Sequence, residues 1–258
     1  MTIKRVLALI LAAAITLSLC GCSGAESDLN AAGRRLSKEP YKVVTKISFY
    51  SADPACAELL SRLGGSNFPL TVDGDKVMAS GRTTEGGKDI FLTLCMIDDV
   101  LYYTALADGL THRFLVPLGE EERAELDEKY RSREEITYSD FTTVEYLNDS
   151  DRNVIVCSEL EEKKLDAAFG QVLVATAPVR DFDTVRLLGA NMRCVLRDGR
   201  FRFVTTVYRF SIEIEKGVVC EAEMITEQAY TYEGVSPINI PDDYYLYDEV
   251  SYAELFGE

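Results

Sequence analysis

The sequence lacks the residue combinations that mark the common enzyme and metal sites. Its only histidine is His112, and no two cysteines have the C-x-x-C spacing, so a zinc site of the usual ligand spacing is not expected. No G-x-S-x-G, H-E-x-x-H, P-loop or dinucleotide-binding motif is present. His112 lies in a strand-like stretch with no nucleophile pattern beside it, which is typical of an ordinary strand residue. We therefore expect that the protein is not an enzyme and that it binds no cofactor and no metal ion.

Positive charge is also scarce. The chain has 27 lysines and arginines against 43 aspartates and glutamates, for a formal net charge of −16. A surface this acidic repels phosphates, so nucleic acid is not an expected partner and anionic head groups are not expected to bind through electrostatics. The 47% hydrophobic content predicts a globular protein. An apolar or a cationic ligand stays possible.

The first two dozen residues carry the clearest pattern. Lys4 and Arg5 precede an apolar run over residues 6–19, and the small residue Gly21 follows shortly after it. The run is short for a bilayer span, and its basic start and small-residue end are typical of a cleaved secretion signal. We expect a signal peptide at residues 1–21.

The end of this run resembles a known modification signal. The tetrad Leu19-Cys20-Gly21-Cys22 is similar to the lipobox of bacterial lipoproteins. The resemblance implies cleavage after Gly21 and attachment of a diacylglyceryl group to the Cys22 sulfur. Cys22 is favoured over Cys20 because the lipidated cysteine must follow a small residue. We expect a protein of the cell envelope, extracytoplasmic and lipid-anchored; a cleaved signal with an incidental cysteine is the alternative.

Five cysteines remain in the mature chain: Cys56, Cys95, Cys157, Cys194 and Cys220. An odd number cannot close completely into disulfides. Most lie in apolar strand-like surroundings, which favours buried thiols that act as small hydrophobic residues.

Alternating apolar residues predict antiparallel strands over most of the mature chain. Residues 41–50 alternate as a half-buried strand, and Asp73-Gly74 predicts the turn of a hairpin between residues 68–72 and 76–82. Residues 89–97 are apolar on both faces, which predicts a strand covered on both sides.

The strand over residues 201–214 changes its apolar phase, from odd positions at Phe201 and Phe203 to even positions from Tyr208 onward. This predicts a β-bulge, as in a sheet that curls toward a barrel. The tyrosine-bearing tail is expected to pack on the sheet, with partner binding as the alternative.

Three other segments carry different expectations. Residues 23–33 are small and polar, which predicts a flexible tether. Residues 120–133 predict a charged surface helix. A capping box at Ser158-x-x-Glu161 predicts an amphipathic helix, either a core helix or a lid over a cavity. Its apolar stripe is Leu165, Ala168, Phe169 and Val172.

Long antiparallel strands with a helical interruption, and without βαβ alternation, predict an α+β fold with a strongly curved antiparallel sheet. We expect a lipidated cysteine and flexible tether at residues 22–36, followed by one antiparallel α+β domain at residues 37–258.

The turn sequences and the closing segment resemble those of small bacterial lipoproteins. They are Val72-Asp73-Gly74-Asp75-Lys76-Val77, Asp98-Asp99-Val100-Leu101-Tyr102-Tyr103 and Ile238-Asn239-Ile240-Pro241. Together with the lipobox they are similar to the LolA/LppX-like superfamily. The resemblance implies a half-open β-barrel that wraps around helices and encloses an apolar cavity for lipid or acyl chains.

Three functions follow as hypotheses. The first is a membrane-anchored protein whose curved sheet binds or carries an apolar ligand, with Leu165, Phe169, Val172, Phe91 and Phe203 as candidate ligand-binding residues. The second is an anchored interaction module with a filled core, which binds an envelope protein through its acidic, tyrosine-bearing surface. The third, a hydrolase that uses scattered carboxylates, has no motif in its favour.

We predict that Cys22→Ala releases the protein from membranes, because the diacylglyceryl anchor requires the Cys22 sulfur. Fractionation of cells that express the two proteins tests this. A variant that stays firmly membrane-bound would show that the anchor lies elsewhere.

Overall fold

The computed structural model describes residues 24–61, 66–85, 88–122, 137–148, 151–162, 184–215 and 218–256. Its strands are β1 (Tyr41–Tyr50), β2 (Ser66–Asp73), β3 (Lys76–Glu85), β4 (Lys88–Ile97), β5 (Val100–Ala107), β6 (Leu110–Pro117), β7 (Phe141–Asn148), β8 (Asp151–Leu160), β9 (Thr184–Arg197), β10 (Arg200–Glu215), β11 (Val218–Thr231) and β12 (Asp248–Glu249). Its helices are α2 (Gly24–Leu36), α3 (Pro54–Ser61), α7 (Tyr252–Phe256) and the 3-10 turns η1 (Tyr138–Asp140) and η2 (Tyr244–Leu246).

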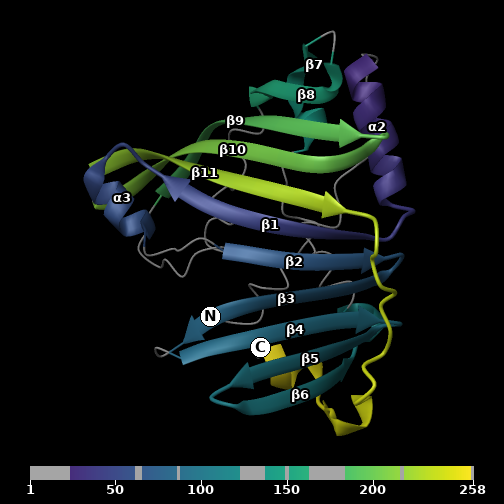
Figure 1. Ribbon diagram of the computed structural model, residues 1–258. Helices are drawn as coiled ribbons and strands as arrows, with labels where there is room; N and C mark the ends of the chain where they lie inside the picture. The colour runs from purple at the N-terminus through teal and green to yellow at the C-terminus, as the bar shows by residue number, and fades with distance from the viewer. Residues whose placement is uncertain are drawn as a thin grey trace.

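The strands of the described residues form one twelve-stranded sheet in the order β12-β6-β5-β4-β3-β2-β1-β11-β10-β9-β8-β7. All neighbours pair antiparallel except β12 and β6. β1 lies inside the sheet; β2 to β6 build outward from it on one side, and β7 to β11 return from the far edge to its other side (Figure 1). β6 and β7 are consecutive strands in the sequence, but they lie in opposite halves of the sheet. The two outermost strands, β12 and β7, do not pair with each other. The sheet is therefore curved but not closed into a barrel. The predicted α+β fold with a strongly curved, half-open sheet is confirmed.

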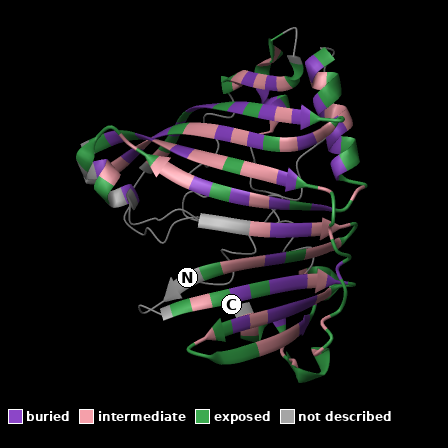
Figure 2. Cartoon of the chain, viewed as in Figure 1, coloured by how far each residue is buried: buried purple, intermediate pink, exposed green. Residues whose placement is uncertain are grey.

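One face of the sheet carries the main core, and we call it the inner face. It is the face that holds Tyr41, Val43 and Ile47 of β1, each at most 2% exposed, whereas Lys42 and Lys46 point to the other side. The strand register continues this alternation across the sheet, as the banding of buried and exposed residues in Figure 2 shows. Buried residues from β1 to β11 join α2 and α3 in a single apolar cluster.

Two predicted local features are confirmed. Asp73 pairs with Lys76 across a tight turn in which Gly74 has φ +67°, a conformation that favours glycine. β10 does contain the predicted bulge, but its register shifts between Phe201 and Phe203, and again between Arg209 and Phe210, and not between Phe203 and Tyr208.

The expectation of a flexible tether is wrong from Gly24 onward, because α2 starts there. Ala25, Leu29 and Ala32 are buried against the sheet with the spacing of one helix face. Alanine is small enough to let the helix approach β7 and β10 closely. Two hydrogen bonds fix its exposed edge: Tyr138 Oη donates to Asn30 at 2.6 Å, and Tyr146 Oη donates to Asp28 at 2.7 Å.

The structure describes only part of the two other predicted helices, the one at residues 120–133 and the one that starts near Ser158. Ser158 belongs to β8, which runs to Leu160, so it is not the predicted helix cap. The strand continues because its residues pair with β7 as far as Phe141. Residues 1–23, 123–136 and 163–183 lie outside the described residues, and with them the signal peptide, Cys22 and most of both predicted helices.

We predict that Leu29→Ala lowers the free energy of unfolding by about 2–5 kcal/mol, because it removes a fully buried side chain from the core. Ser27→Ala, on the exposed side of α2, serves as the control and should change it by less than about 0.5 kcal/mol. Urea denaturation measures both. Equal effects of the two changes would mean that α2 does not pack on the sheet in solution.

Candidate functional site

The structure places the two described ligand-binding candidates on the outer face. Phe91 is 51% exposed beside Arg82, whose guanidinium carbon lies 5.6 Å from the ring centre. Its neighbour Leu92 takes the inner position of β4 at 5% exposure. Phe203 is 56% exposed because the bulge turns it outward. Neither residue contributes to the inner face.

The other three candidates, Leu165, Phe169 and Val172, lie outside the described residues. The amphipathic stripe they form in the sequence stays a prediction.

The outer face of β4 and β5 carries a second, smaller core. Cys95, Ile97 and Tyr102 are buried there against Ile238 of the C-terminal tail. β4 is therefore covered on both faces at residues 95–97, whereas its first half is exposed on the outer face at Phe91, so the prediction holds for the second half of the strand only. The tail supplies the outer cover.

The tail then passes around the edge of the sheet (Figure 1). Tyr247 packs edge-on against Tyr102, with ring centres 5.6 Å apart, and its hydroxyl lies 2.8 Å from Thr104 Oγ1. Next, β12 pairs with the edge strand β6, and Tyr252 of α7 is buried in the inner-face cluster. The predicted packing of the tail on the sheet is confirmed, and it covers an edge that could otherwise pair with another chain.

One part of the tail stays open to solvent. Tyr244, Tyr245 and Leu246 of η2 are 54%, 72% and 52% exposed. The two tyrosine rings meet edge-to-face at 6.2 Å. Adjacent exposed aromatic side chains of this kind are common in protein interfaces.

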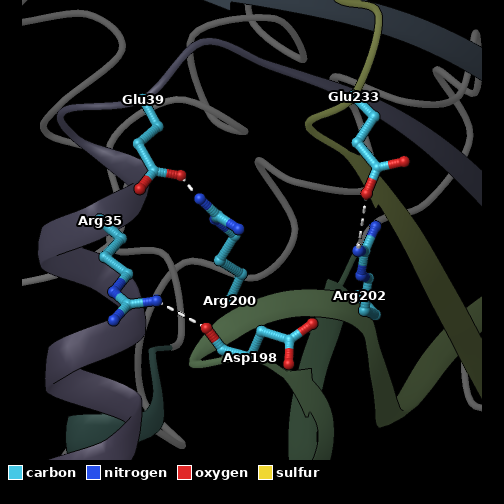
Figure 3. A network of polar contacts seen from close by, with 6 residues as sticks. All are labelled: Arg35, Glu39, Asp198, Arg200, Arg202 and Glu233. Atoms are coloured by element: carbon cyan, nitrogen blue, oxygen red, sulfur yellow. Dashed lines mark hydrogen bonds and ion pairs between the residues drawn. The ribbon is translucent and has the colours of Figure 1, made fainter.

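Polar side chains gather where α2 ends, β10 begins and β11 ends (Figure 3). We call Arg200, Arg202 and Tyr232, with Glu39 and Glu233, the Arg–Tyr cluster. Arg200 Nε donates to Glu39 at 2.6 Å, and Arg202 Nη2 lies 3.9 Å from the carboxylate of Glu233. Both guanidinium groups lie over the Tyr232 ring, with their carbons 5.5 and 5.9 Å from its centre. The tyrosine is thus flanked by two cations.

A hydrogen bond from α2 to the turn before β10 also lies next to the Arg–Tyr cluster. Arg35 Nη1 donates to the backbone carbonyl of Asp198 at 2.6 Å, in the turn that leads into β10 (Figure 3). Gly199 in that turn has φ +67°, and a Cβ there would meet Arg35 Nη1 at 3.1 Å. Glycine therefore allows both the turn and the close approach of Arg35.

The environment of the cluster shifts the pKa values of Tyr232 and Glu39 and raises that of Arg200 through its hydrogen bond with Glu39. Burial raises the pKa of Tyr232 to about 12; the charge of Glu39 adds to the shift, and Arg200 and Arg202 oppose it. The hydrogen bond from Arg200 lowers the pKa of Glu39. Burial also raises the pKa of Tyr41, whose ring lies 6.3 Å from that of Tyr232. These tyrosines stay neutral at physiological pH.

Sequence reasoning did not single out this cluster. Its signals are the alternation Arg200-Phe201-Arg202-Phe203 after an Asp-Gly turn and the pair Tyr230-x-Tyr232. Nothing in the local sequence joins the two segments.

All five described cysteines are free and buried, as the sequence predicts. Cys194 forms a thiol hydrogen bond with Cys157, which together with burial raises its pKa; burial and Cys56 raise that of Cys220 to about 12. Burial raises the pKa of Cys95 to about 11. Protonated, inaccessible thiols are poor nucleophiles, so these three have a structural role.

The described ranges contain no candidate membrane-spanning helix and no candidate metal site. No helix there has the length and apolar character needed to cross a membrane. Likewise, no group of three or more histidine, cysteine, aspartate or glutamate side chains comes together there in a way that could hold a metal ion.

Comparison with known proteins does not assign a family. No family model matches the chain, and no curated protein matches it. A solved structure of a variant of the GphF dehydratase has 12% sequence identity over 80% of this chain and 82% of that chain, with a TM-score of 0.13. A TM-score this low carries no argument about fold or activity.

We predict that the protein loses stability as the pH rises from 10 toward 12. The unfolded chain releases the Tyr232 proton near pH 10, whereas the folded protein holds it to about 12, so the folded state binds more protons in this range. Tyr232→Phe should make this pH dependence shallower. Urea midpoints at pH 9, 10 and 11 measure it, with Tyr245→Phe as the control at an exposed site. Parallel pH profiles for the wild type and Tyr232→Phe would show that Tyr232 is not buried.

Proposed function

We propose that this protein is a lipoprotein of the cell envelope, anchored through Cys22, that binds or carries an apolar ligand such as a lipid or acyl chain on the inner face of its sheet. The observation that carries the proposal is the pairing of an open sheet with a continuous apolar inner face. An open, curved sheet can admit a long chain from its unclosed side, and burial of that chain against aliphatic and aromatic residues stabilises the complex.

The N-terminal geometry agrees with an anchored protein. α2 starts at Gly24, only two residues after Cys22, and packs directly on the sheet. Two residues span at most about 7 Å. A lipid on Cys22 would therefore hold the folded part of the chain close to the membrane, near the β7 end of the sheet (Figure 1). Such closeness suits transfer of a poorly soluble ligand to or from the bilayer.

The described residues support a binding role more than a catalytic one. The shifted thiols are protonated, and His112 is exposed on strand β6. A reactive residue would need an activating partner in a protected site.

A second candidate function rests on a different observation. The exposed Tyr244, Tyr245 and Leu246 of η2 form an apolar, aromatic surface in an acidic segment that includes Asp242 and Asp243. This favours an anchored interaction module that binds an envelope protein through η2. In that case the inner face serves only as a core.

Native mass spectrometry separates the two functions. The mature chain from residue 22, with Cys22→Ser to prevent acylation, is purified without detergent, since α2 belongs to the core and must be retained. We expect one lipid bound per chain, recovered by extraction. A ligand-free mass that does not change after incubation with an envelope lipid extract would overturn the lipid-binding function and favour the interaction module.

A further inference from the structure

The Arg–Tyr cluster holds both of the buried side-chain polar atoms that lack a hydrogen-bond partner in the described part of the chain. They are Arg202 Nε and Tyr232 Oη. The backbone amide of Phe201 affects the Tyr232 pKa but makes no hydrogen bond of ordinary geometry with the hydroxyl. Buried donors are nearly always paired in folded proteins, so two unpaired donors in one cluster require an explanation.

Both atoms can donate a hydrogen bond, and the surrounding charge favours an anionic acceptor. Among the described residues, the ion-pair partner of Arg202 is Glu233 alone, at 3.9 Å, and that side chain is 92% exposed. An exposed pair at this distance is weak, because water screens it. Glu39, in contrast, is engaged by Arg200. Within the part of the chain that the structure describes, no strong partner therefore balances the charge of the partly buried Arg202 guanidinium group.

The acidic net charge of the chain does not prevent an anion from binding at the Arg–Tyr cluster. Charges on the rest of the surface are screened over about 8 Å at physiological ionic strength. Within the cluster, hydrogen bonds to Nε and to the Tyr232 hydroxyl act at contact distance. An anion can bind here even though the protein as a whole repels one.

The cluster also adjoins the apolar inner face. The ring of Tyr41 lies 5.9 Å from that of Tyr230, which lies 5.9 Å from that of Phe201. All three rings belong to the inner-face core cluster. A molecule held by Arg202 and Tyr232 would thus have its charged end at the cluster, directly beside the buried apolar rings of this core.

The β10 bulge accounts for the direction of Arg202. Phe201 pairs with Leu196 and Phe203 with Val195, so Arg202 is the extra residue that has no partner on β9. This places the Arg202 guanidinium over Tyr232 while Phe201 stays in the core. Bulges commonly redirect a side chain next to a functional site.

We propose that the Arg–Tyr cluster binds the anionic head group of an amphiphilic ligand, a carboxylate or a phosphate, through Arg202 Nε and the Tyr232 hydroxyl. This inference rests on the proposed lipid-binding function and specifies its ligand class. The head group accepts both unpaired hydrogen bonds, and its apolar chain lies along the inner face.

Binding of matched ligands tests the proposal. The mature chain with Cys22→Ser is titrated by calorimetry with palmitate, palmitoyl lysophosphatidate and hexadecanol, which share a sixteen-carbon chain but differ in the head group. We expect the better of the two anions to bind at least about tenfold more tightly than hexadecanol. Whether it carries the carboxylate or the phosphate identifies the head group.

Variants locate the preference in the cluster. Arg202→Gln and Tyr232→Phe should each reduce the anion's affinity toward that of hexadecanol, while Arg193→Gln, an exposed arginine on the outer face of β9, should not. Tyr232→Phe removes only an unpaired hydroxyl, so its urea midpoint at pH 7 should match the wild type and a loss of binding cannot be attributed to misfolding.

The outcomes that overturn the site differ from those that overturn the function. Equal binding of the anions and hexadecanol, or an anion preference that survives both cluster variants, would refute the head-group site while lipid binding stands. Failure of all three ligands to bind would remove the proposed function together with the site.

Discussion

The pairing of β1 with β11 is the constraint on which the rest of the structure depends. Nine consecutive residue pairs, from Lys42 with Thr231 to Tyr50 with Glu223, join the start of the folded chain to its last long strand. This pairing unites two runs of antiparallel strands into one sheet and leaves β6 and β7 far apart. It also brings Glu39, which lies between α2 and β1, close enough to Tyr232, which follows β11, to affect its pKa. Contacts this distant in sequence carry a high loop-closure cost, so we expect them to limit the folding rate.

Different elements pack at the two ends of the sheet. On the β6 side the C-terminal tail buries Cys95 and Tyr102 on the outer face, adds β12 to the edge and returns Tyr252 to the inner face. On the β7 side α2 packs close to the outermost strand through Tyr146. An open sheet exposes unpaired backbone groups at its edges, which invites association with other strands. The tail therefore pairs with the β6 edge through β12, and α2 packs beside β7.

One irregularity connects the fold to the proposed site. A regular β10 would place Phe201 and Phe203 on the same face and Arg202 on the other. The bulge instead leaves Phe201 buried, turns Phe203 to solvent and brings Arg202 over Tyr232. The same shift that removes Phe203 from the ligand-binding candidates thus creates the cluster with unpaired donors.

The sequence by itself determined the strands, several turns, the bulge and the α+β class, because these follow from alternation and turn chemistry within a few residues. It did not reveal α2, since a helix of sparse alanines and leucines is stable only against the sheet. Nor did it tell which side of β4 faces inward, because both faces are apolar and alternation alone cannot choose between Phe91 and Leu92. Arg202 and Tyr232 meet only through the register of β10 and β11. Tertiary structure decided the site because no local pattern encodes a contact between strand ends thirty residues apart.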